Sequence, residues 1–308
     1  MTTLFYSHDA CIAHDPGPHH PEQPARLRAV LDALDDAAFA GLDRREAPLA
    51  DIACIERVHD SGYVAATLAS EPAEGRIHLD PDTAMSTGSA EAALRAAGAL
   101  CAAVDAVVAG EGKNAFCAVR PPGHHAEQDR AMGFCLFNNV AIGARHAQSA
   151  HGLGRVAVVD FDVHHGNGTQ HMFEADADLF FASTHQFPYY PGSGAATEAG
   201  VGNIVNVPLA AGAGGVEFRA AMNNTILPAL REFGPDFLFI SAGFDAHADD
   251  PLAGLNFLEA DYEWATSELC ALADECCSGR LVSTLEGGYD LAALASSAAT
   301  HVRALMAA

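Results

Sequence analysis

The chain has 308 residues and a mass of 32.0 kDa, with half of its residues hydrophobic and 18% charged, which excludes a disulfide-stapled miniprotein and a disordered chain. No apolar run approaches the roughly 20 residues of a membrane-spanning helix, and MTTLFYSHDA lacks the pattern of a secretory signal, so we expect a soluble, cytoplasmic protein with no membrane partner. The formal net charge of −24 argues against direct nucleic-acid binding, because an acidic chain repels phosphate backbones.

The first third of the chain predicts one short strand followed by three helices. The strand is LFYS, residues 4–7, and the helices lie near 22–35, 52–69 and 88–110. The last of these is rich in alanine and ends at Gly110, a residue that commonly stops helices. No internal repeat, low-complexity tract or charged linker divides the sequence, so we expect a single domain over residues 1–308.

From residue 114 the pattern alternates between strands and helices. The predicted strands are continuous apolar runs, which is typical of strands covered on both faces. Amphipathic stretches between several of them predict helices, and this alternation favours an open, mainly parallel α/β sheet with helices on both sides. The strands are expected at 114–120, 155–162, 179–184, 203–209, 236–242 and 280–286, and the helices near 138–150, 215–232, 259–277 and 290–306.

Five polar motifs fall at or just after the carboxyl ends of these strands. In open α/β sheets that edge is where ligands bind. The five loops are therefore expected to converge on one site. They are RPPGHH, DVHHGNG, HQFPYYPG, GFDAH and EGGYD.

Asp162 and His164 are candidate metal ligands. They are two residues apart, so in an extended segment their side chains would point to the same side. With Asp245 they offer two carboxylates and an imidazole, and three protein ligands with an open position are typical of a catalytic metal. The set suits Zn²⁺ or another borderline ion such as Fe²⁺ or Co²⁺. The alternative is that the two carboxylates simply cap helices.

The adjacent histidines His124 and His125 are candidates for acid-base chemistry. They follow a rigid Pro-Pro-Gly turn, and histidine titrates near neutral pH. Asp160 lies on the same face as Asp162 in the strand alternation and could fix the tautomer of a histidine. Tyr289 could stabilise an oxyanion. The alternatives are a surface histidine pair and a tyrosine packed at a helix start.

Other nucleophiles are disfavoured by the sequence. There is no GxSxG elbow, no Walker loop and no GxGxxG loop. The eight cysteines show no CxxC spacing, most have apolar neighbours, and we interpret them as buried, reduced and structural. Metal-activated water is then the remaining nucleophile. The cysteines are Cys11, Cys54, Cys101, Cys117, Cys135, Cys270, Cys276 and Cys277.

Taken together, these motifs resemble the histone deacetylase family over nearly the whole chain. The HHGNG and EGGY forms look more similar to the class II branch and to its bacterial deacetylase and acetylpolyamine amidohydrolase relatives, and they suggest a bacterial origin. The motifs are HPEQPARL (20–27), RPPGHHA (120–126), GFCLFNN (133–139), DFDVHHGNGTQ (160–170), GFDAH with DPLAG (243–254) and EGGYD (286–290).

The resemblance implies the arginase-deacetylase fold, with a central eight-stranded parallel sheet between helical layers. It places one Zn²⁺ per chain on Asp162, His164 and Asp245. It also implies a structural potassium ion, held by the main-chain oxygens of Asp160, Asp162 and His164 and by the hydroxyl of Ser183.

The same resemblance assigns the catalytic roles. It makes His125 the general base and acid, His124 the partner histidine held by Asp160, and Tyr289 the residue that polarises the substrate carbonyl. Asn167 stands where some members have a carboxylate. An amide at that position would orient His125 without raising its pKa, so His125 could stay neutral and accept a proton from water.

The substrate tunnel is expected to have aromatic walls at Phe134 and Tyr190, where family members usually carry phenylalanine at the second position. Leu252 stands where a polyamine-selective relative would present an acidic gatekeeper. The chain also lacks the long insertion near residues 80–90 that some polyamine amidohydrolases use.

The function implied is a zinc-dependent amidohydrolase that removes acetyl-like groups from lysine-type amides with metal-activated water. The alternative within hydrolases is an amidohydrolase of acetylpolyamines or xenobiotic amides, which the acidic charge keeps open, although solubility or salt adaptation also explains that charge. A noncatalytic binding module with the same fold is the alternative of another class. An arginase-like dimanganese hydrolase is disfavoured, because ligands for one catalytic metal are found. The sequence leaves the acyl-chain preference open and leaves room for a homo-oligomer.

Overall fold

A parallel sheet forms the centre of the molecule. The computed structural model describes residues 2–308, and in this part of the chain eight parallel strands pair in the order β2-β1-β5-β10-β9-β6-β7-β8. Every residue of β5, β6, β7, β9 and β10 is buried, as expected for strands covered on both faces. The strands are β1 (Thr3–Ser7), β2 (Asp43–Glu46), β5 (Asn114–Cys117), β6 (Val156–Asp160), β7 (Leu179–Gln186), β8 (Ile204–Leu209), β9 (Phe237–Ala242) and β10 (Leu281–Leu285).

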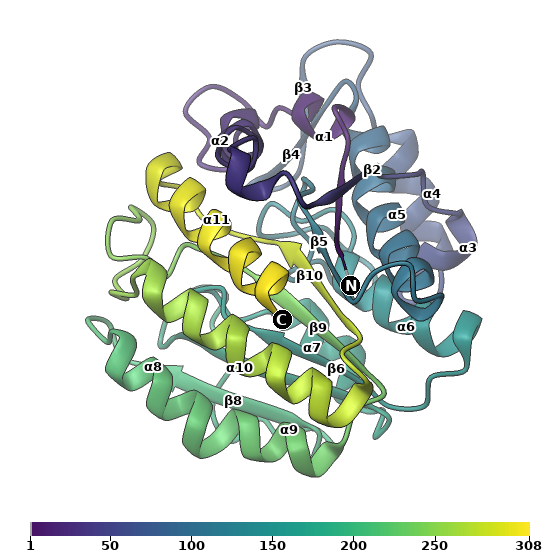
Figure 1. Cartoon of the computed structure of the whole chain (residues 1–308). Helices are drawn as coiled ribbons and strands as arrows, with labels where there is room; N and C mark the ends of the chain where they lie inside the picture. The colour runs from purple at the N-terminus through teal and green to yellow at the C-terminus, as the bar shows by residue number, and fades with distance from the viewer. Residues whose placement is uncertain (1) are drawn as a thin grey trace.

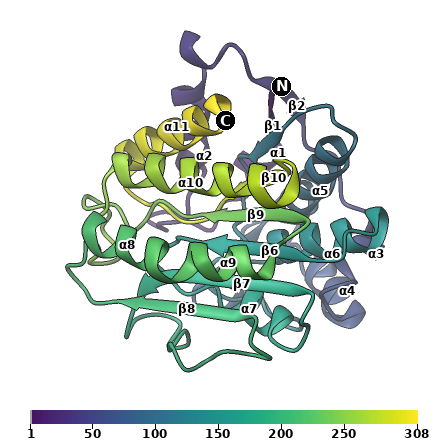
Figure 2. The same ribbon diagram turned by 60° about the horizontal axis from the view of Figure 1, so that its bottom comes forward.

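Helices cover both faces of this sheet. On one face α10 and α11 lie side by side, with α2 packed against α11, and with α8 and α9 beside α10 (Figure 1). The other face carries α5, α6 and α7, and Figure 2 shows the layers from a second direction. The helices are α1 (Ala10–Ala13), α2 (Pro24–Leu34), α3 (Ile52–Ile55), α4 (Ser61–Ala69), α5 (Ser89–Val108), α6 (Asn139–His151), α7 (Asn167–Phe173), α8 (Gly215–Ala221), α9 (Leu227–Phe233), α10 (Glu259–Cys277) and α11 (Leu291–Ala307).

Three smaller elements complete the fold. A separate antiparallel pair, β3 (Arg76–Asp80) and β4 (Thr83–Ser86), precedes α5. A 3-10 turn covers Ala37–Phe39, and a π-helical turn over Met222–Ile226 joins α8 to α9. Within residues 2–308, no helix combines the length and the hydropathy needed to cross a bilayer.

The predicted strands and helices are present, with differences at their ends. The helix expected over 52–69 is divided into α3 and α4. The division lies where His59 donates a hydrogen bond from Nδ1 to the carbonyl of Glu127 at 2.9 Å, and where Asp60 takes an extended backbone at the start of α4. A tertiary contact therefore interrupts a segment whose local pattern is helical throughout. The helix expected over 215–232 is interrupted by the π-helical turn.

Candidate active site

The largest group of sequence-predicted site residues lines one cavity of about 160 Å³. It lies beyond the carboxyl ends of β5, β10, β9 and β6, which are neighbours in the sheet. The convergence expected for the strand-end loops is therefore present. The cavity is lined by Asp82, Pro122, His124, His125, Gly133, Phe134, His164, Tyr190, Leu252, Gly287 and Tyr289.

The three predicted metal ligands meet at the floor of this cavity. Nδ1 of His164 lies 3.2 Å from Oδ1 of Asp162 and 3.1 Å from Oδ2 of Asp245. One ligand atom from each residue falls within 4.8 Å of the others. Both carboxylates are 1% exposed, so the group is shielded from bulk water.

The reason predicted for this convergence is wrong, although the residues are the expected ones. The strand expected over 155–162 ends at Asp160, so strand alternation does not align Asp160, Asp162 and His164. Instead, Oδ1 of Asp160 accepts a hydrogen bond from the Asp162 amide at 3.0 Å, and Oδ1 of Asp162 accepts one from the His164 amide at 2.9 Å. These two side-chain turns bend the chain out of the sheet.

Backbone amides fix the two carboxylates. Oδ1 of Asp245 accepts from the Val163 amide, and Oδ2 of Asp162 accepts from the Gly287 amide, both at 2.8 Å. A Cβ atom at Gly287 would collide with both carboxylates. Glycine is therefore required where the EGGY loop passes this close to the ligands.

The charge of the group fits a divalent cation. Burial and the charge of Asp162 raise the pKa of Asp245 to about 7, because two carboxylates are held together away from water. Burial opposes a charged imidazole at His164, but hydrogen bonds and charge from both aspartates outweigh it and raise its pKa to about 10. The site thus attracts positive charge, and its two carboxylate oxygens and one imidazole nitrogen suit Zn²⁺ with a position left open.

His124 is held by Asp160, as expected. Its Nδ1 donates to Oδ2 of Asp160 at 2.9 Å, and both residues are buried. Burial disfavours the charged ring, but the charges of Asp160 and Asp162 outweigh it and raise the pKa of His124 to about 10. Glu286 also positions this loop, because its Oε2 accepts from the amides of Gly123 at 2.7 Å and His124 at 3.2 Å. Sequence analysis quoted Glu286 within a motif and gave it no role.

His125 is oriented by Asn167. Its Nδ1 lies 2.8 Å from Oδ1 of Asn167, whose amide nitrogen donates to Oε1 of Glu127. Because that nitrogen needs an acceptor, the Asn167 oxygen must face the ring, so Nδ1 of His125 carries the hydrogen and Nε2 is free to accept a proton. Burial, followed by the charges of His124 and His164, lowers the pKa of His125 well below its usual range. Glu127 was missed, although it lies only two residues beyond His125.

Tyr289 lines the cavity and is fixed through its backbone and its ring. Its amide donates to Oδ2 of Asp250 at 2.6 Å, and the Arg26 guanidinium lies 4.8 Å from the ring centroid. Arg26 also donates to the carbonyl of Glu286 at 2.6 Å, which ties α2 to the EGGY loop. Burial raises the pKa of Tyr289 well above its usual value, so its hydroxyl stays protonated and can donate. Arg26 and Asp250 were both missed, since no local pattern marks them.

The predicted tunnel residues Phe134, Tyr190 and Leu252 all line the cavity. The ring of Tyr190 stands edge-on to His125, with centroids 5.2 Å apart, and Phe134 adopts a positive φ of 68°. A positive φ at a non-glycine residue is costly and is found where a functional loop is constrained. Asp82, another missed residue, accepts from the Gly133 amide at 3.0 Å and holds this loop.

Ser183, the predicted side-chain ligand of a potassium ion, is buried in β7 and pairs with Asp160 of β6. Its Oγ lies 2.9 Å from Nδ1 of His185, whose Nε2 lies 2.9 Å from the carbonyl of Gly194. Since Nε2 must donate to that carbonyl, Nδ1 accepts the serine hydrogen and the lone pairs of Oγ stay available. The potassium site itself stays a prediction.

Comparisons with known proteins agree with this geometry. The family model described as a histone deacetylase domain matches residues 20–305. Histone deacetylase 14 of Arabidopsis thaliana, a chloroplastic protein, is 42% identical over 98% of this chain and 76% of its own length. A histone deacetylase-like amidohydrolase of Pseudomonas aeruginosa is 38% identical over 93% of this chain and 81% of its own. The solved structure of the HDA15 HD domain superposes with a TM-score of 0.94, at 36% identity over 99% of this chain and 88% of that one.

Proposed function

The chain belongs to the histone deacetylase family and has its single α/β domain with the arginase-deacetylase fold, and from this we propose that it is a zinc-dependent hydrolase that removes acetyl-like groups from lysine-type amides. One observation carries the proposal. A cavity with apolar and aromatic walls ends at two carboxylates and an imidazole, with His125 and Tyr289 beside them. We further propose that residues 1–308 act as one catalytic domain and that a structural potassium ion binds near Ser183.

Asp162, His164 and Asp245 would hold the single Zn²⁺ of the catalytic centre. Bound there, the ion would supply Lewis-acid chemistry, lowering the pKa of water and polarising a carbonyl. The chain's own contribution is to hold these three ligands rigidly through the amides of Val163 and Gly287.

His125 is the general base in this proposal. Asn167 holds its proton on Nδ1, which leaves Nε2 to take a proton from the attacking water. The low pKa of the ring keeps it neutral before the reaction. The protonated ring can then give that proton to the leaving amine. His124, charged and held by Asp160, adds a fixed positive charge beside the base.

Tyr289 is the donor for the oxyanion that develops on the amide carbonyl. Its hydroxyl stays protonated, and its position is set by Asp250 and Arg26 before substrate arrives. A preorganised donor of this kind stabilises the transition state more than the ground state.

The walls support an acylated, unbranched amine as the substrate. Phe134, Tyr190 and Leu252 offer apolar contact to an aliphatic chain that crosses the cavity. The acidic charge of the protein favours cationic substrates and disfavours nucleic acid.

A hydrolysis panel tests the proposal. The zinc-reconstituted protein is given an acetyl-lysine peptide, a trifluoroacetyl-lysine peptide, acetylspermidine and a neutral anilide, each with and without a hydroxamate chelator. We expect chelator-sensitive cleavage with the lysine substrates preferred. Preference for acetylspermidine or the anilide would instead make it a small-molecule amidohydrolase, and no cleavage by zinc-loaded protein would make it a noncatalytic module.

A further inference from the structure

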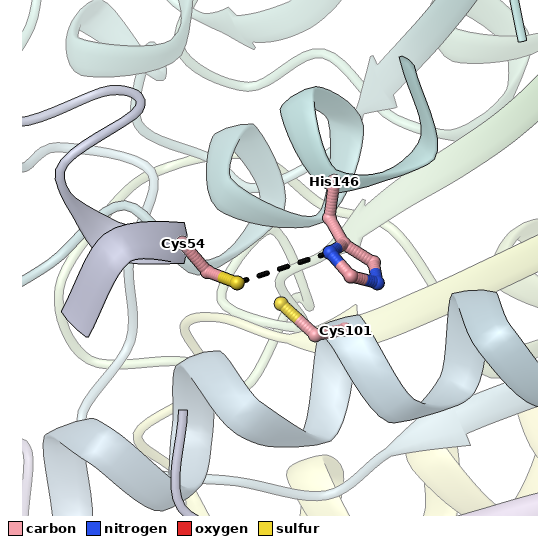
Figure 3. Close-up of side chains that lie close together, drawn as sticks. All are labelled: Cys54, Cys101 and His146. Carbon is pink, nitrogen blue, oxygen red and sulfur yellow. Dashed lines mark hydrogen bonds between the residues drawn. The ribbon is translucent and has the colours of Figure 1, made fainter. Parts of the chain in front are cut away.

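Outside the catalytic cavity, we propose a second metal site formed by Cys54, Cys101 and His146, which takes a thiophilic divalent ion such as Zn²⁺. The three side chains come from three different helices, α3, α5 and α6, and point toward one another (Figure 3). None of them is among the residues that line the catalytic cavity. Their wide spacing in the sequence explains why no metal-binding pattern was visible there.

The distances are close to those of a bound ion. Sγ of Cys54 lies 3.9 Å from Nδ1 of His146, and the three ligand atoms all fall within 4.8 Å of one another. Zinc bonds of about 2.3 Å to sulfur and about 2.0 Å to nitrogen, in tetrahedral geometry, separate the two atoms by roughly 3.5 Å. A small inward rotation of the side chains would complete the site.

The orientation of His146 is already that of a metal ligand. Its Nε2 donates to Oδ1 of Asp105 at 2.7 Å, so the lone pair of Nδ1 faces the two sulfur atoms. A carboxylate that accepts from the far nitrogen of a histidine is the usual support for a metal-bound imidazole. Asp105 also contacts Nε2 of His151 at 2.6 Å, which fixes the carboxylate in turn.

The local charges also fit a divalent ion. Two thiolates neutralise its charge, and Asp105 balances Arg57, whose guanidinium lies 3.5 Å from Sγ of Cys54 and 3.2 Å from Nδ1 of His146. The hydrogen bond from Cys101, helped by Arg57 and His146, lowers the pKa of Cys54 to about 6, so a thiolate is present at neutral pH. Arg57 is exposed, so its side chain can move from Nδ1 when the ion binds.

The ion would join a weakly anchored helix to two long ones. The α3 helix has only four residues, whereas α5 has 20 and α6 has 13. The three ligands are nearly buried, with exposures of 9%, 8% and 9% for Cys54, Cys101 and His146. We therefore expect a structural role, with three protein ligands and one position left to water.

Cobalt substitution tests the site separately from the catalytic centre. Thiolate ligands give Co²⁺ an intense near-ultraviolet charge-transfer absorption, and the proposed catalytic ligands include no thiolate. Reduced, folded protein saturated with Co²⁺ should bind two ions per chain and show this absorption. The double variant Cys54→Ser with Cys101→Ser should lose the absorption and one ion, and keep kcat/KM for the acetyl-lysine peptide within about twofold.

Matched variants exclude trivial outcomes. Cys276→Ser, on α10 and outside the cluster, should keep the absorption. Asp105→Asn should keep it and weaken cobalt affinity about 10- to 100-fold, and it replaces the double variant if that protein does not fold. The proposal is overturned if wild type shows no absorption, if the absorption survives in the double variant, or if a second ion binds without it. That last result would place the ion at Asp105, His146 and His151 instead. Catalytic failure with the absorption intact would count only against the proposed function.

Discussion

Asn167 turns its side-chain oxygen toward Nδ1 of His125, 2.8 Å away, because its amide nitrogen donates to Glu127. This contact fixes both the tautomer and the charge of the proposed base. A carboxylate in the same position would keep the geometry but favour a protonated ring. The difference between an amide and a carboxylate therefore sets the pH at which His125 can act.

Asn167→Asp tests this relationship. The new negative charge should raise the pKa of His125, so the acidic limb of kcat/KM against pH should move to higher pH by about one unit or more. The sign follows because a base must be unprotonated, and a higher pKa reduces the unprotonated fraction at a given pH. Glu127→Gln keeps an acceptor for Asn167 and should not move the limb upward. An unmoved limb in Asn167→Asp would count against His125 as the base.

Tyr289→Phe removes the proposed oxyanion donor and leaves the ring in place. We expect kcat to fall by about 100-fold, in the range found when one such donor is lost. Metal content by mass spectrometry and the circular dichroism spectrum should be unchanged, because no contact of the ring or backbone is altered. Unchanged turnover would remove Tyr289 from the mechanism.

Leu252→Glu tests the control of substrate selectivity. Leu252 lines the cavity, and its carbonyl accepts a hydrogen bond from the hydroxyl of Tyr189, so the backbone there is held while the side chain is free to vary. A carboxylate should lower KM for acetylspermidine several-fold, and added salt should reverse the gain. Leu252→Gln, of similar size and without charge, is the control. Equal effects in the two variants would show that charge is not the cause.

Glu22 holds together two buried arginines near the site. Its carboxylate accepts from Arg120 at 2.7 Å and from Arg26 at 3.0 Å, and all three side chains are fully buried. Glu22→Gln should lower the free energy of unfolding by about 3–5 kcal/mol, because it leaves buried guanidinium charge uncompensated. Urea titration measures the change. Glu275→Gln, which breaks an exposed pair with Arg231, should cost less than about 1 kcal/mol.

The same carboxylate should make stability depend on pH. Burial alone would raise the pKa of Glu22, but Arg120, with hydrogen bonds from His14 and Arg120, outweighs burial and holds it well below the ordinary value of 4.5. The folded state therefore binds fewer protons there than the unfolded state. The stability due to Glu22 should be complete above about pH 5 and decline as pH falls below 4.5. The difference in urea midpoint between wild type and Glu22→Gln should narrow in that acidic range, and a constant difference would contradict this.

The central strands and the metal ligands could be predicted because their signals are local. Continuous apolar runs marked strands such as β9 and β10, and the polar motifs lay directly at their ends. Edge strand β2 escaped prediction because its sequence, DRRE, is charged, with Arg44 and Glu46 exposed. The four residues of α1 are too few for a helical period, and α7 lies inside a motif interpreted as a loop.

The supporting residues of the site could not be predicted, because their contacts span large distances in sequence. Arg26 donates to carbonyls 260 and 262 residues away, and Asp82 accepts from an amide 51 residues away. No periodicity or motif records such pairs. Only the folded chain shows that an arginine of α2 and an aspartate before β4 help to shape the cavity.

The place of β10 in the sheet has a consequence for biosynthesis. This strand, the last in the chain, lies between β5 and β9 and joins β2-β1-β5 to β9-β6-β7-β8. Until residues 281–285 leave the ribosome, the nascent chain therefore holds two partial sheets, each with an apolar edge lacking its neighbour. Such edges pair readily with other chains. A message cut short before this point would yield a protein prone to aggregate, and completion of the last strand would close the sheet and deliver Tyr289 to the catalytic cavity.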